Sequence, residues 1–378
     1  MNKIGFFSCS VGWGGLEMNV LKLAHWLYKR GWELTLYTNE NSRIYLESKK
    51  YSIKTHVIPN HRKYFDFLGA YRFYRMLKKH KIDNIFVFDN RDLDFIYLTK
   101  LFSFGKLKVV YQQHMQIGLN KKDILHTMRF SGIDHWIAPL NFLKNEVRER
   151  TRLDPAKIEV IPLGTEVNEF ILPKYQKSEA RHKLNIDPSV FLLGILGRID
   201  PKKGQYFLVE AIRALNNKSI NAELLIMGEP TINEPESYQY FVALKQYLIE
   251  HNLSDKVHIR NYTSDISLFY NAIDVFILAS EGETYGMVTI EAMLSRLPVI
   301  ATNSGGTPEI LNFGELGLLY IWNDLDNFCE KVSWILQNQE ASDLMATKAQ
   351  KVASEKFSHN HECELIEKLF EKAPAELI

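Results

Sequence analysis

The chain has 378 residues, with 46 Lys or Arg against 45 Asp or Glu, so its formal net charge at pH 7 is only +1. Apolar residues make up 46% and charged residues 24%, as is typical of globular proteins. These values exclude a disordered chain and a uniformly basic nucleic-acid coat protein. The length favours two domains, and no apolar run reaches the roughly 18 residues of a membrane span.

The first ten residues, MNKIGFFSCS, are expected to form a strand rather than a secretion leader. The apolar part is short, and Trp13 lies where a cleavage region would be. The three cysteines, Cys9, Cys329 and Cys363, are widely spaced and form no C-x-x-C pair. We therefore expect neither a disulfide framework nor a zinc site. A reducing, cytoplasmic setting fits this pattern.

Short apolar runs alternate with longer amphipathic stretches through the first half of the chain. In the first of these stretches, apolar residues recur at three- and four-residue spacing, and Gly31 ends the predicted helix. Such alternation predicts a parallel sheet covered by helices on both faces. The predicted strands span residues 4–8, 34–38, 84–88, 108–111, 135–138 and 158–161, and the helices include 16–30, 65–80 and 141–150.

The second half of the chain repeats this plan. Strands are predicted at 191–196, 223–227, 257–260, 275–279 and 299–302. Between residues 170 and 189 the periodicity is interrupted, with Pro173 and Pro188 among the breaking residues, so we place a domain boundary after residue 173. In open sheets of this kind, ligands bind at the carboxyl ends of the strands.

One carboxylate-rich segment follows the predicted strand 275–279 and opens into a helix near Gly286. The first N–H groups of such a helix and its dipole suit a phosphate. Glu283 lies before this helix and Glu291 lies eight positions later. Each carboxylate has two acceptor oxygens and suits the neighbouring hydroxyls of a ribose or hexose. Glutamates in a helix are also commonly solvated, and the neighbours of Glu291 do not settle its orientation.

Two further turns follow predicted strands. Arg198 and Lys203 come directly after strand 191–196, where a guanidinium and an ammonium would neutralise a diphosphate. The same residues also fit a solvated basic turn. Gly305 and Gly306 follow strand 299–302, and glycines there allow backbone to approach a ligand, although such turns are common without one.

The order and spacing of these segments resemble the retaining, nucleotide-sugar-dependent glycosyltransferases of the GT-B fold, specifically glycosyltransferase family 4. The family's E-x7-E signature matches residues 283–291, its Gly-Arg…Lys-Gly motif matches 197–198 and 203–204, and its Gly-Gly-x-x-Glu-Ile motif matches 305–310. In the first half, the Gly-Gly loop at 12–17, a strand ending in His114 and the segment 160–164 also match.

The resemblance covers most of the chain and implies an α/β architecture of the GT-B type. Two Rossmann-like, doubly wound domains are expected to face a central cleft. Residues 1–173 would form the acceptor-binding domain and residues 174–360 the donor-binding domain. A C-terminal helix at about 361–378 would pack back on the first domain.

The resemblance also implies roles for individual residues. Arg198 and Lys203 are expected to bind the donor diphosphate and support its departure. Glu291 would hold the ribose diol, and Glu283 would hold hydroxyls of the transferred sugar. His114 would contact this sugar from the other domain, and Gly15 would allow close approach of donor or acceptor. The remaining expected donor contacts are backbone groups around Tyr285, Gly286, Met287 and Val288, with Asn261 and Tyr262 beside the nucleobase.

In the family's usual mechanism the acceptor attacks from the face that the diphosphate leaves, and the departing phosphate accepts the proton. Catalysis then rests on leaving-group charge and positioning. We expect no cofactor and no metal, because Asp92 and Asp94, which have Asp-x-Asp spacing, lie in the other domain. Arg296 and Asn261 stand where the family commonly has glycine, which leaves the donor base open.

Three other functions fit the sequence less well than this one. A dehydrogenase is disfavoured because Glu17 breaks the G-x-G-x-x-G pattern and Trp13 would crowd a dinucleotide. A GT-B epimerase or phosphorylase keeps the fold with different chemistry, although the E-x7-E frame with Arg198 and Lys203 favours transfer from a nucleotide sugar. The complete motif set disfavours a silent carbohydrate-binding protein.

Residues 61–81 contain seven Lys or Arg against one acid and are dense in Tyr and Phe. Such helices lie on anionic membranes or present a solvated basic face. Residues 1–173 have a net charge of +10 and residues 174–378 a net charge of −9, so the near-neutral total conceals a polarised chain.

A UDP-hexose is the first expected donor, followed by UDP-N-acetylhexosamine and GDP-mannose. We hypothesise that a basic face (Arg72, Arg75, Lys78 and Lys79) brings the protein to a glycan or lipid-linked acceptor at the inner membrane surface, with no nucleic-acid partner.

Overall fold

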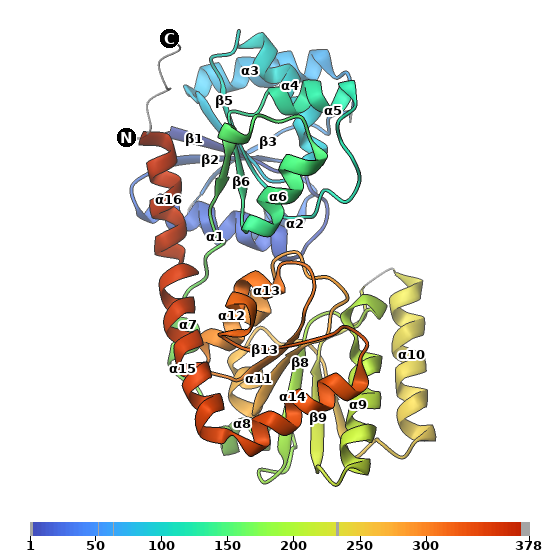
Figure 1. The fold of residues 1–378 in the computed structure, drawn as a ribbon. Coiled ribbons are helices and arrows are strands. Elements are labelled where there is room, and N and C mark those ends of the chain that lie inside the picture. Colours follow the sequence, from blue (N-terminus) through green and yellow to red (C-terminus); the bar gives the residue numbers. More distant parts are fainter. Residues whose placement is uncertain (1–2, 52, 63, 232–233, 372–378) are drawn as a thin grey trace. The chain divides into compact units, whose positions relative to one another are not determined.

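The computed structural model describes residues 3–51, 53–62, 64–231 and 234–371. The chain divides into two compact units. Unit 1 comprises Met1–Gly164 with His359–Ile378, and unit 2 comprises Thr165–Ser358. Each unit is built on one parallel sheet with helices on both faces, as Figure 1 shows. The described helices include none with the length and apolar character needed to cross a bilayer.

Unit 1 contains a seven-stranded sheet of order β3-β2-β1-β4-β5-β6-β7. The chain moves outward from β1 to β3 and then returns to β4, so the strand order reverses between β1 and β4. The carboxyl ends of the strands beside such a reversal form the usual ligand-binding edge. The strands are β1 (Lys3–Phe7), β2 (Glu33–Thr38), β3 (Lys54–Val57), β4 (Asn84–Val87), β5 (Lys108–Gln112), β6 (His135–Ala138) and β7 (Ile158–Val160).

The helices of unit 1 cover two separate apolar cores, one on each face of this sheet. Phe6 and Phe7 are both fully buried but belong to opposite cores, because successive side chains of a strand point to opposite faces. The helices are α1 (Gly15–Lys29), α2 (Arg43–Ser48), α3 (Phe67–His80), α4 (Leu93–Phe102), α5 (Ile124–Ser131), α6 (Asn141–Arg150) and α16 (His359–Glu371), with short turns η1 (Asn90–Asp92) and η2 (Pro155–Lys157).

Helix α16 packs against α1 within unit 1, although the two are far apart in sequence. Arg30 forms an ion pair with Glu367 at 2.7 Å. The ring of Trp32 meets that of Phe370 edge-on, with centroids 5.3 Å apart. The helix begins at His359, two residues before the expected start, and residues 372–378 of the expected helix lie outside the described residues.

Unit 2 contains a six-stranded sheet of order β10-β9-β8-β11-β12-β13, which reverses between β8 and β11. Its strands are β8 (Phe191–Leu196), β9 (Ala222–Met227), β10 (Val257–Arg260), β11 (Val275–Leu278), β12 (Val299–Thr302) and β13 (Leu318–Tyr320). Its helices are α7 (Asn168–Ile171), α8 (Lys177–Lys183), α9 (Gln205–Asn217), α10 (Pro235–Glu250), α11 (Ser267–Ala272), α12 (Met287–Leu294), α13 (Thr307–Ile310), α14 (Leu325–Gln337) and α15 (Gln339–Lys356), with η3 (Pro201–Lys203) and η4 (Asn312–Gly314).

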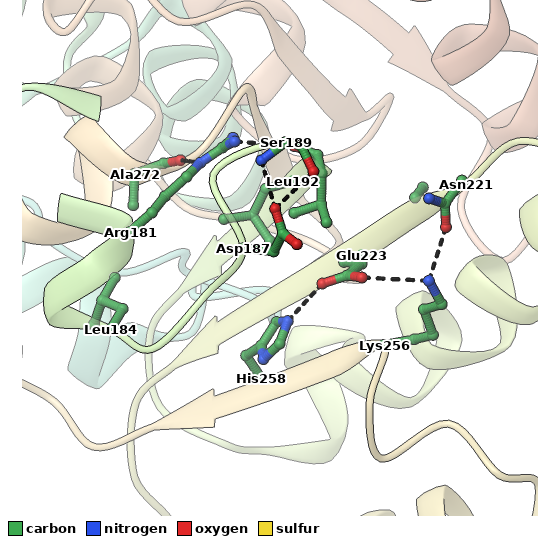
Figure 2. Close-up of polar contacts among 12 residues, drawn as sticks. Arg181, Leu184, Asp187, Ser189, Leu192, Asn221, Glu223, Lys256, His258 and Ala272 are labelled. Carbon is green, nitrogen blue, oxygen red and sulfur yellow. Dashed lines mark hydrogen bonds and ion pairs between the residues drawn. The ribbon is translucent and has the colours of Figure 1, made fainter. Parts of the chain in front are cut away.

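Buried charges in unit 2 are paired within the fold, as Figure 2 shows for two groups. Arg181 on α8 is 2% exposed and donates to the Ala272 carbonyl at 2.8 Å and to Asp274 at 2.6 Å. Lys256 and His258 converge on Glu223 of β9. These groups are hydrogen-bonded within the fold and therefore offer no free binding group.

Two edge strands, β3 and β13, were not predicted from the sequence. Strand β3 has the sequence Lys-Thr-His-Val and is only partly buried, so it lacks an apolar run. Strand β13 has three residues. The structure also divides the chain before α7 rather than after residue 173, because Phe170 on α7 packs edge-on against Tyr270 of unit 2 at 5.8 Å.

Candidate active site

An ion pair lies at the carboxyl ends of β8 and β11, where the strand order of unit 2 reverses. The Lys203 ammonium donates to Glu283 Oε2 at 2.7 Å, and the Ser280 hydroxyl donates to the same oxygen at 3.2 Å. The side chains of Lys203 and Glu283 are 29% and 19% exposed. The pair is therefore partly desolvated yet open on one side, at the edge where open α/β sheets bind ligands.

Two glycines hold the backbone of this pair in place. Gly204, with φ +75°, follows Lys203, and a Cβ there would lie 2.2 Å from the Ala279 carbonyl oxygen. At Gly305, with φ +61°, a Cβ would lie 2.3 Å from the Glu283 carbonyl oxygen. The Gly306 N–H donates to that same oxygen at 2.8 Å. The Gly-Gly turn thus approaches the backbone of Glu283 itself.

The N-terminus of α12 forms a second part of the site. Gly286, with φ +80°, precedes the helix, and no side chain among the described residues caps it. The first N–H groups, on Met287 and Val288, have no acceptor within the helix. The nearby hydroxyls of Thr289, Ser304 and Thr307 are also buried without a partner in the described part of the chain. Such groups suit a polar ligand at this end of the helix.

Glu291 is oriented by a residue that sequence reasoning missed. The Tyr270 hydroxyl on α11 donates to Glu291 Oε2 at 2.7 Å. Tyr262, in the loop after β10, is 56% exposed, and burial together with the Glu291 charge raises the pKa of its phenol. Tyr262 and Asn261, the residues expected beside the nucleobase, are both exposed in this loop. Nothing in the sequence pattern marks Tyr270 as a partner.

Two further predicted donor residues, Arg198 and Tyr285, also lie in unit 2. Arg198 is exposed, and its Nη1 lies 3.4 Å from the Thr231 hydroxyl. Tyr285 is only 5% exposed, and its ring packs edge-on against Phe357. The side chain of Tyr285 belongs to the core, so any ligand contact there must come from its backbone.

The two remaining predicted residues lie in unit 1. His114 follows β5; its Nε2 is covered and has no partner among the described residues. Burial lowers the pKa of His114 to about 4, so its imidazole is neutral at physiological pH. Gly15 is the first residue of α1, and a Cβ there would have no neighbour within 4 Å among the described atoms.

Arg296 explains one departure from the family pattern. It follows the last turn of α12 with φ +57°, the left-handed conformation that favours glycine. Its guanidinium pairs with Asp343 at 2.6 Å on the surface. Glycine at this position would adopt the same left-handed conformation without strain.

The chain has two Rossmann-like units, and in unit 2 a basic turn and an E-x7-E segment lie at one sheet edge. This combination is typical of glycosyltransferases of the GT-B class. The family model "Glycosyltransferase Family 4" matches residues 13–169, and "Glycosyl transferases group 1" matches residues 176–352. The chain belongs to glycosyltransferase family 4.

Individual relatives agree with this assignment. The chain is 27% identical over 238 residues to the capsular polysaccharide biosynthesis glycosyltransferase CapM of Staphylococcus aureus, covering 62% of this chain and 60% of CapM. It is 28% identical over 179 residues to the UDP-Gal:alpha-D-GlcNAc-diphosphoundecaprenol alpha-1,3-galactosyltransferase of Escherichia coli, covering 47% of this chain and 44% of that enzyme. The chain spans about half the length of the curated relatives it matches.

A solved structure shows the same fold over nearly the whole chain. The protein HepE from Anabaena, in a crystal structure with UDP and glucose, has a TM-score of 0.80 and 19% identity, covering 99% of this chain and 100% of HepE. This likeness confirms the predicted α/β fold of two Rossmann-like domains.

Proposed function

We propose that this protein is a retaining glycosyltransferase that moves a hexose from a nucleoside-diphosphate sugar, with a UDP-sugar favoured, to a glycan or lipid-linked acceptor. The partly buried Lys203–Glu283 pair beside the uncapped start of α12 carries the proposal. The UDP and glucose bound in HepE support this donor class. The names of the CapM and galactosyltransferase relatives support a role in cell-envelope polysaccharide or glycolipid synthesis.

We expect the donor diphosphate to bind to cations that the fold already holds in place. Lys203 is fixed by Glu283 when no donor is bound. An arriving diphosphate competes for this ammonium and gains the exposed Arg198 as a second cation. Glu283 is then free to accept hydrogen bonds from hydroxyls of the transferred sugar. These cations stabilise the charge that develops on the leaving phosphate, so the proposal requires no metal and no cofactor for transfer.

The rest of the donor would follow the same sheet edge. The N–H groups of Met287 and Val288, with the backbone of Tyr285 and Gly286, suit the distal phosphate. Glu291, restrained by Tyr270, suits the two ribose hydroxyls, and Tyr262 with Asn261 suits the base. This order matches nucleoside, diphosphate and sugar along one ligand.

His114 and Gly15 belong to unit 1, which would bind the acceptor. His114 would contact the transferred sugar, and Gly15 would allow close approach of donor or acceptor. A neutral imidazole offers one donor and one acceptor to sugar hydroxyls without adding charge. In a front-face substitution the leaving phosphate accepts the acceptor's proton, so His114 positions the sugar and is not required as a base. Transfer through this face would retain the anomeric configuration.

Helix α3 supplies the proposed membrane contact. Its residues Ala70, Phe73 and Leu77 are buried against the sheet, whereas the four residues of the basic face are exposed. Phe65, Phe67 and Leu68 at its start are 68%, 54% and 60% exposed. Cationic side chains beside exposed aromatic and aliphatic ones suit an anionic membrane surface. The proposed location is therefore cytoplasmic and peripheral to the membrane.

Nucleotide release tests the proposed reaction. The purified chain is mixed with UDP-glucose, UDP-N-acetylglucosamine or GDP-mannose, with and without a lipid-linked saccharide fraction from cell envelopes. We expect nucleoside diphosphate to be released at a higher rate only when both donor and acceptor are present. Interconversion of the sugar without an acceptor would instead indicate an epimerase, and release that requires orthophosphate would indicate a phosphorylase.

A further inference from the structure

Three side chains outside the donor site meet at the sheet edge of unit 1. Cys9 follows β1, Asp92 ends η1 after β4, and His61 follows β3. The Cys9 Sγ, a ring nitrogen of His61 and a carboxylate oxygen of Asp92 all lie within 4.8 Å of one another. β1 and β4 are the strands between which the order reverses. The proposed transfer reaction uses none of these three residues.

The hydrogen bonds of His61 leave one nitrogen aimed at an acceptor. His61 Nδ1 lies 3.1 Å from the Arg62 carbonyl oxygen, which can only accept, so this nitrogen carries a hydrogen. His61 Nε2 lies 3.0 Å from Asp92 Oδ1. In a neutral imidazole with Nδ1 protonated, Nε2 has a lone pair and also accepts. The pair therefore needs a positive charge, which either a second ring proton or a metal cation bound by both groups supplies.

The neighbours of these groups hold them in place. The Phe95 ring stacks on the His61 imidazole with centroids 4.5 Å apart. The Cys9 N–H donates to Asp92 Oδ2 at 3.2 Å, and the Asn39 amide donates to the Cys9 carbonyl at 3.2 Å. In a metal-bound histidine, the ring nitrogen that does not bind the metal typically donates its hydrogen to a carbonyl or carboxylate, which fixes the orientation of the ring. His61 has this arrangement.

We propose that Cys9, His61 and Asp92 bind a zinc ion in unit 1. Thiolate, imidazole and carboxylate are all zinc ligands, and three protein ligands leave a fourth position open to water or a substrate oxygen. Ligand atoms around tetrahedral zinc lie about 3.5 Å apart. Separations of up to 4.8 Å must therefore shorten by little more than an ångström, while His61 Nε2 and Asp92 Oδ1, which are 3.0 Å apart, must separate slightly. The bound cation would deprotonate the thiol.

This site is separate from the diphosphate chemistry and does not change the roles of Lys203 and Arg198. The proposal departs from the expectation, drawn from cysteine spacing, that the chain contains no zinc site. Spacing rules detect ligands that are close in sequence, whereas these three come from separate loops that the sheet brings together.

Cobalt substitution tests the thiolate ligand directly. We expect the full chain to bind one Co²⁺ and to gain a thiolate-to-cobalt charge-transfer band in the near ultraviolet together with visible ligand-field bands. The near-ultraviolet band should be absent from Cys9→Ala and present in Cys329→Ala, whose buried thiol lies in unit 2. A wild-type protein without this band, or a band that persists in Cys9→Ala, would overturn the proposal.

Zinc affinity, measured by competition with a chromophoric chelator, supplies a second readout that does not depend on the Cys9 variant folding. His61→Gln and Asp92→Asn should each weaken zinc binding by at least about tenfold. Zinc should also raise the melting temperature of the wild type and not of these variants. If His61 and Asp92 form a protonated ion pair only, the wild type will show no stoichiometric zinc uptake, and the proposal fails.

Discussion

At the scale of single residues, Lys203 and Glu283 are each held by the other until a ligand arrives. This pairing makes a carboxylate compatible with the proposed diphosphate site, because Glu283 is neutralised by Lys203 at 2.7 Å and its backbone is fixed by Gly306. The spacing of Lys203 and Glu283 was predictable from the motifs. Their direct contact was not, because residues 80 positions apart meet only once β8 and β11 pair.

Glu291 should govern nucleotide affinity through its charge. In Glu291→Gln, the charge-assisted hydrogen bonds to the ribose hydroxyls become neutral ones, a loss of about 1.5 kcal/mol, and the Kd for UDP should rise about tenfold. Isothermal titration calorimetry measures this directly. Tyr270→Phe keeps the carboxylate and removes only its restraint, so its effect should be smaller. Equal affinities in wild type and Glu291→Gln would contradict the assigned role.

The contact between Tyr270 and Glu291 was not predictable from the sequence. Its hydroxyl fixes the carboxylate of Glu291, but it lies 21 positions away on a six-residue helix. The cluster of Cys9, His61 and Asp92 was also missed, since each residue alone has an ordinary structural explanation. Both arrangements depend on which loops follow neighbouring strands, and sequence spacing does not contain that information.

At the scale of elements, the turn after β12 supports the loop after β11. Gly305→Ala should disrupt this support, because the new Cβ would lie 2.3 Å from the Glu283 carbonyl oxygen. We expect UDP binding, followed as a ligand-induced rise in melting temperature, to be lost or strongly reduced.

Gly314→Ala is the matched control for this substitution. Gly314 also has a positive φ, +104°, so alanine is strained there by about 1–2 kcal/mol as well, but a Cβ would meet no atom within 4 Å. The control should lower stability while keeping the ligand-induced shift. Equal ligand shifts in the two variants would show that the Gly305 turn does not position Glu283.

Most elements were predictable because central parallel strands are continuous apolar runs. The central strands β6, β8 and β12 have the predicted bounds, as does the edge strand β10. Prediction failed at two other edge strands, β3 and β13, which are only partly buried. It also failed to foresee the left-handed backbone of Arg296, since a long cationic residue gives no signal for positive φ.

At the scale of the whole molecule, Glu362 links α16 to the rest of unit 1. Its carboxylate accepts from the Gly164 N–H at 2.8 Å and from the Gln112 amide at 2.9 Å. Burial outweighs these hydrogen bonds and raises the pKa of Glu362 from 4.5 to about 7. Between these two values the folded state keeps a proton that the unfolded state releases, so stability falls as pH rises.

Replacing Glu362 with glutamine should flatten this pH dependence, because the amide resembles the protonated acid and does not titrate. Between pH 5 and pH 8 the wild type should lose about 2.5 kcal/mol relative to Glu362→Gln. Thermal unfolding of both proteins across this range measures the difference. Parallel pH profiles would show that Glu362 stays ionised in the folded protein.

The difference in net charge between the two halves of the sequence is also present between the two observed units. Unit 1 contains 29 Lys or Arg and 20 Asp or Glu, whereas unit 2 contains 17 and 25. Unit 1 is thus the part suited to an anionic surface, and the donor phosphates that we propose for unit 2 would rely on local cations.

Liposome flotation tests the membrane contact of unit 1. The wild type should float with anionic vesicles and not with neutral ones, and added salt should weaken the binding. Replacing Arg72, Arg75, Lys78 and Lys79 with glutamine should abolish flotation. The control removes equal charge from exposed lysines of unit 2 (Lys218, Lys245, Lys348 and Lys351). Equal recovery with both vesicle types, or equal loss in both variants, would count against the proposal.

The central claim is that the Lys203–Glu283 pair receives the diphosphate of a nucleotide sugar. The most direct measurement is the melting temperature of the wild type, Lys203→Gln and Lys218→Gln with UDP-, GDP- and ADP-sugars. Lys218 is an exposed lysine of the same unit that pairs with Asp326. Lys203→Gln should lose the donor-induced rise, because the unpaired Glu283 would then repel the diphosphate, whereas wild type and Lys218→Gln should keep it. A wild type that no nucleotide sugar stabilises, or a rise unchanged in Lys203→Gln, would contradict the account.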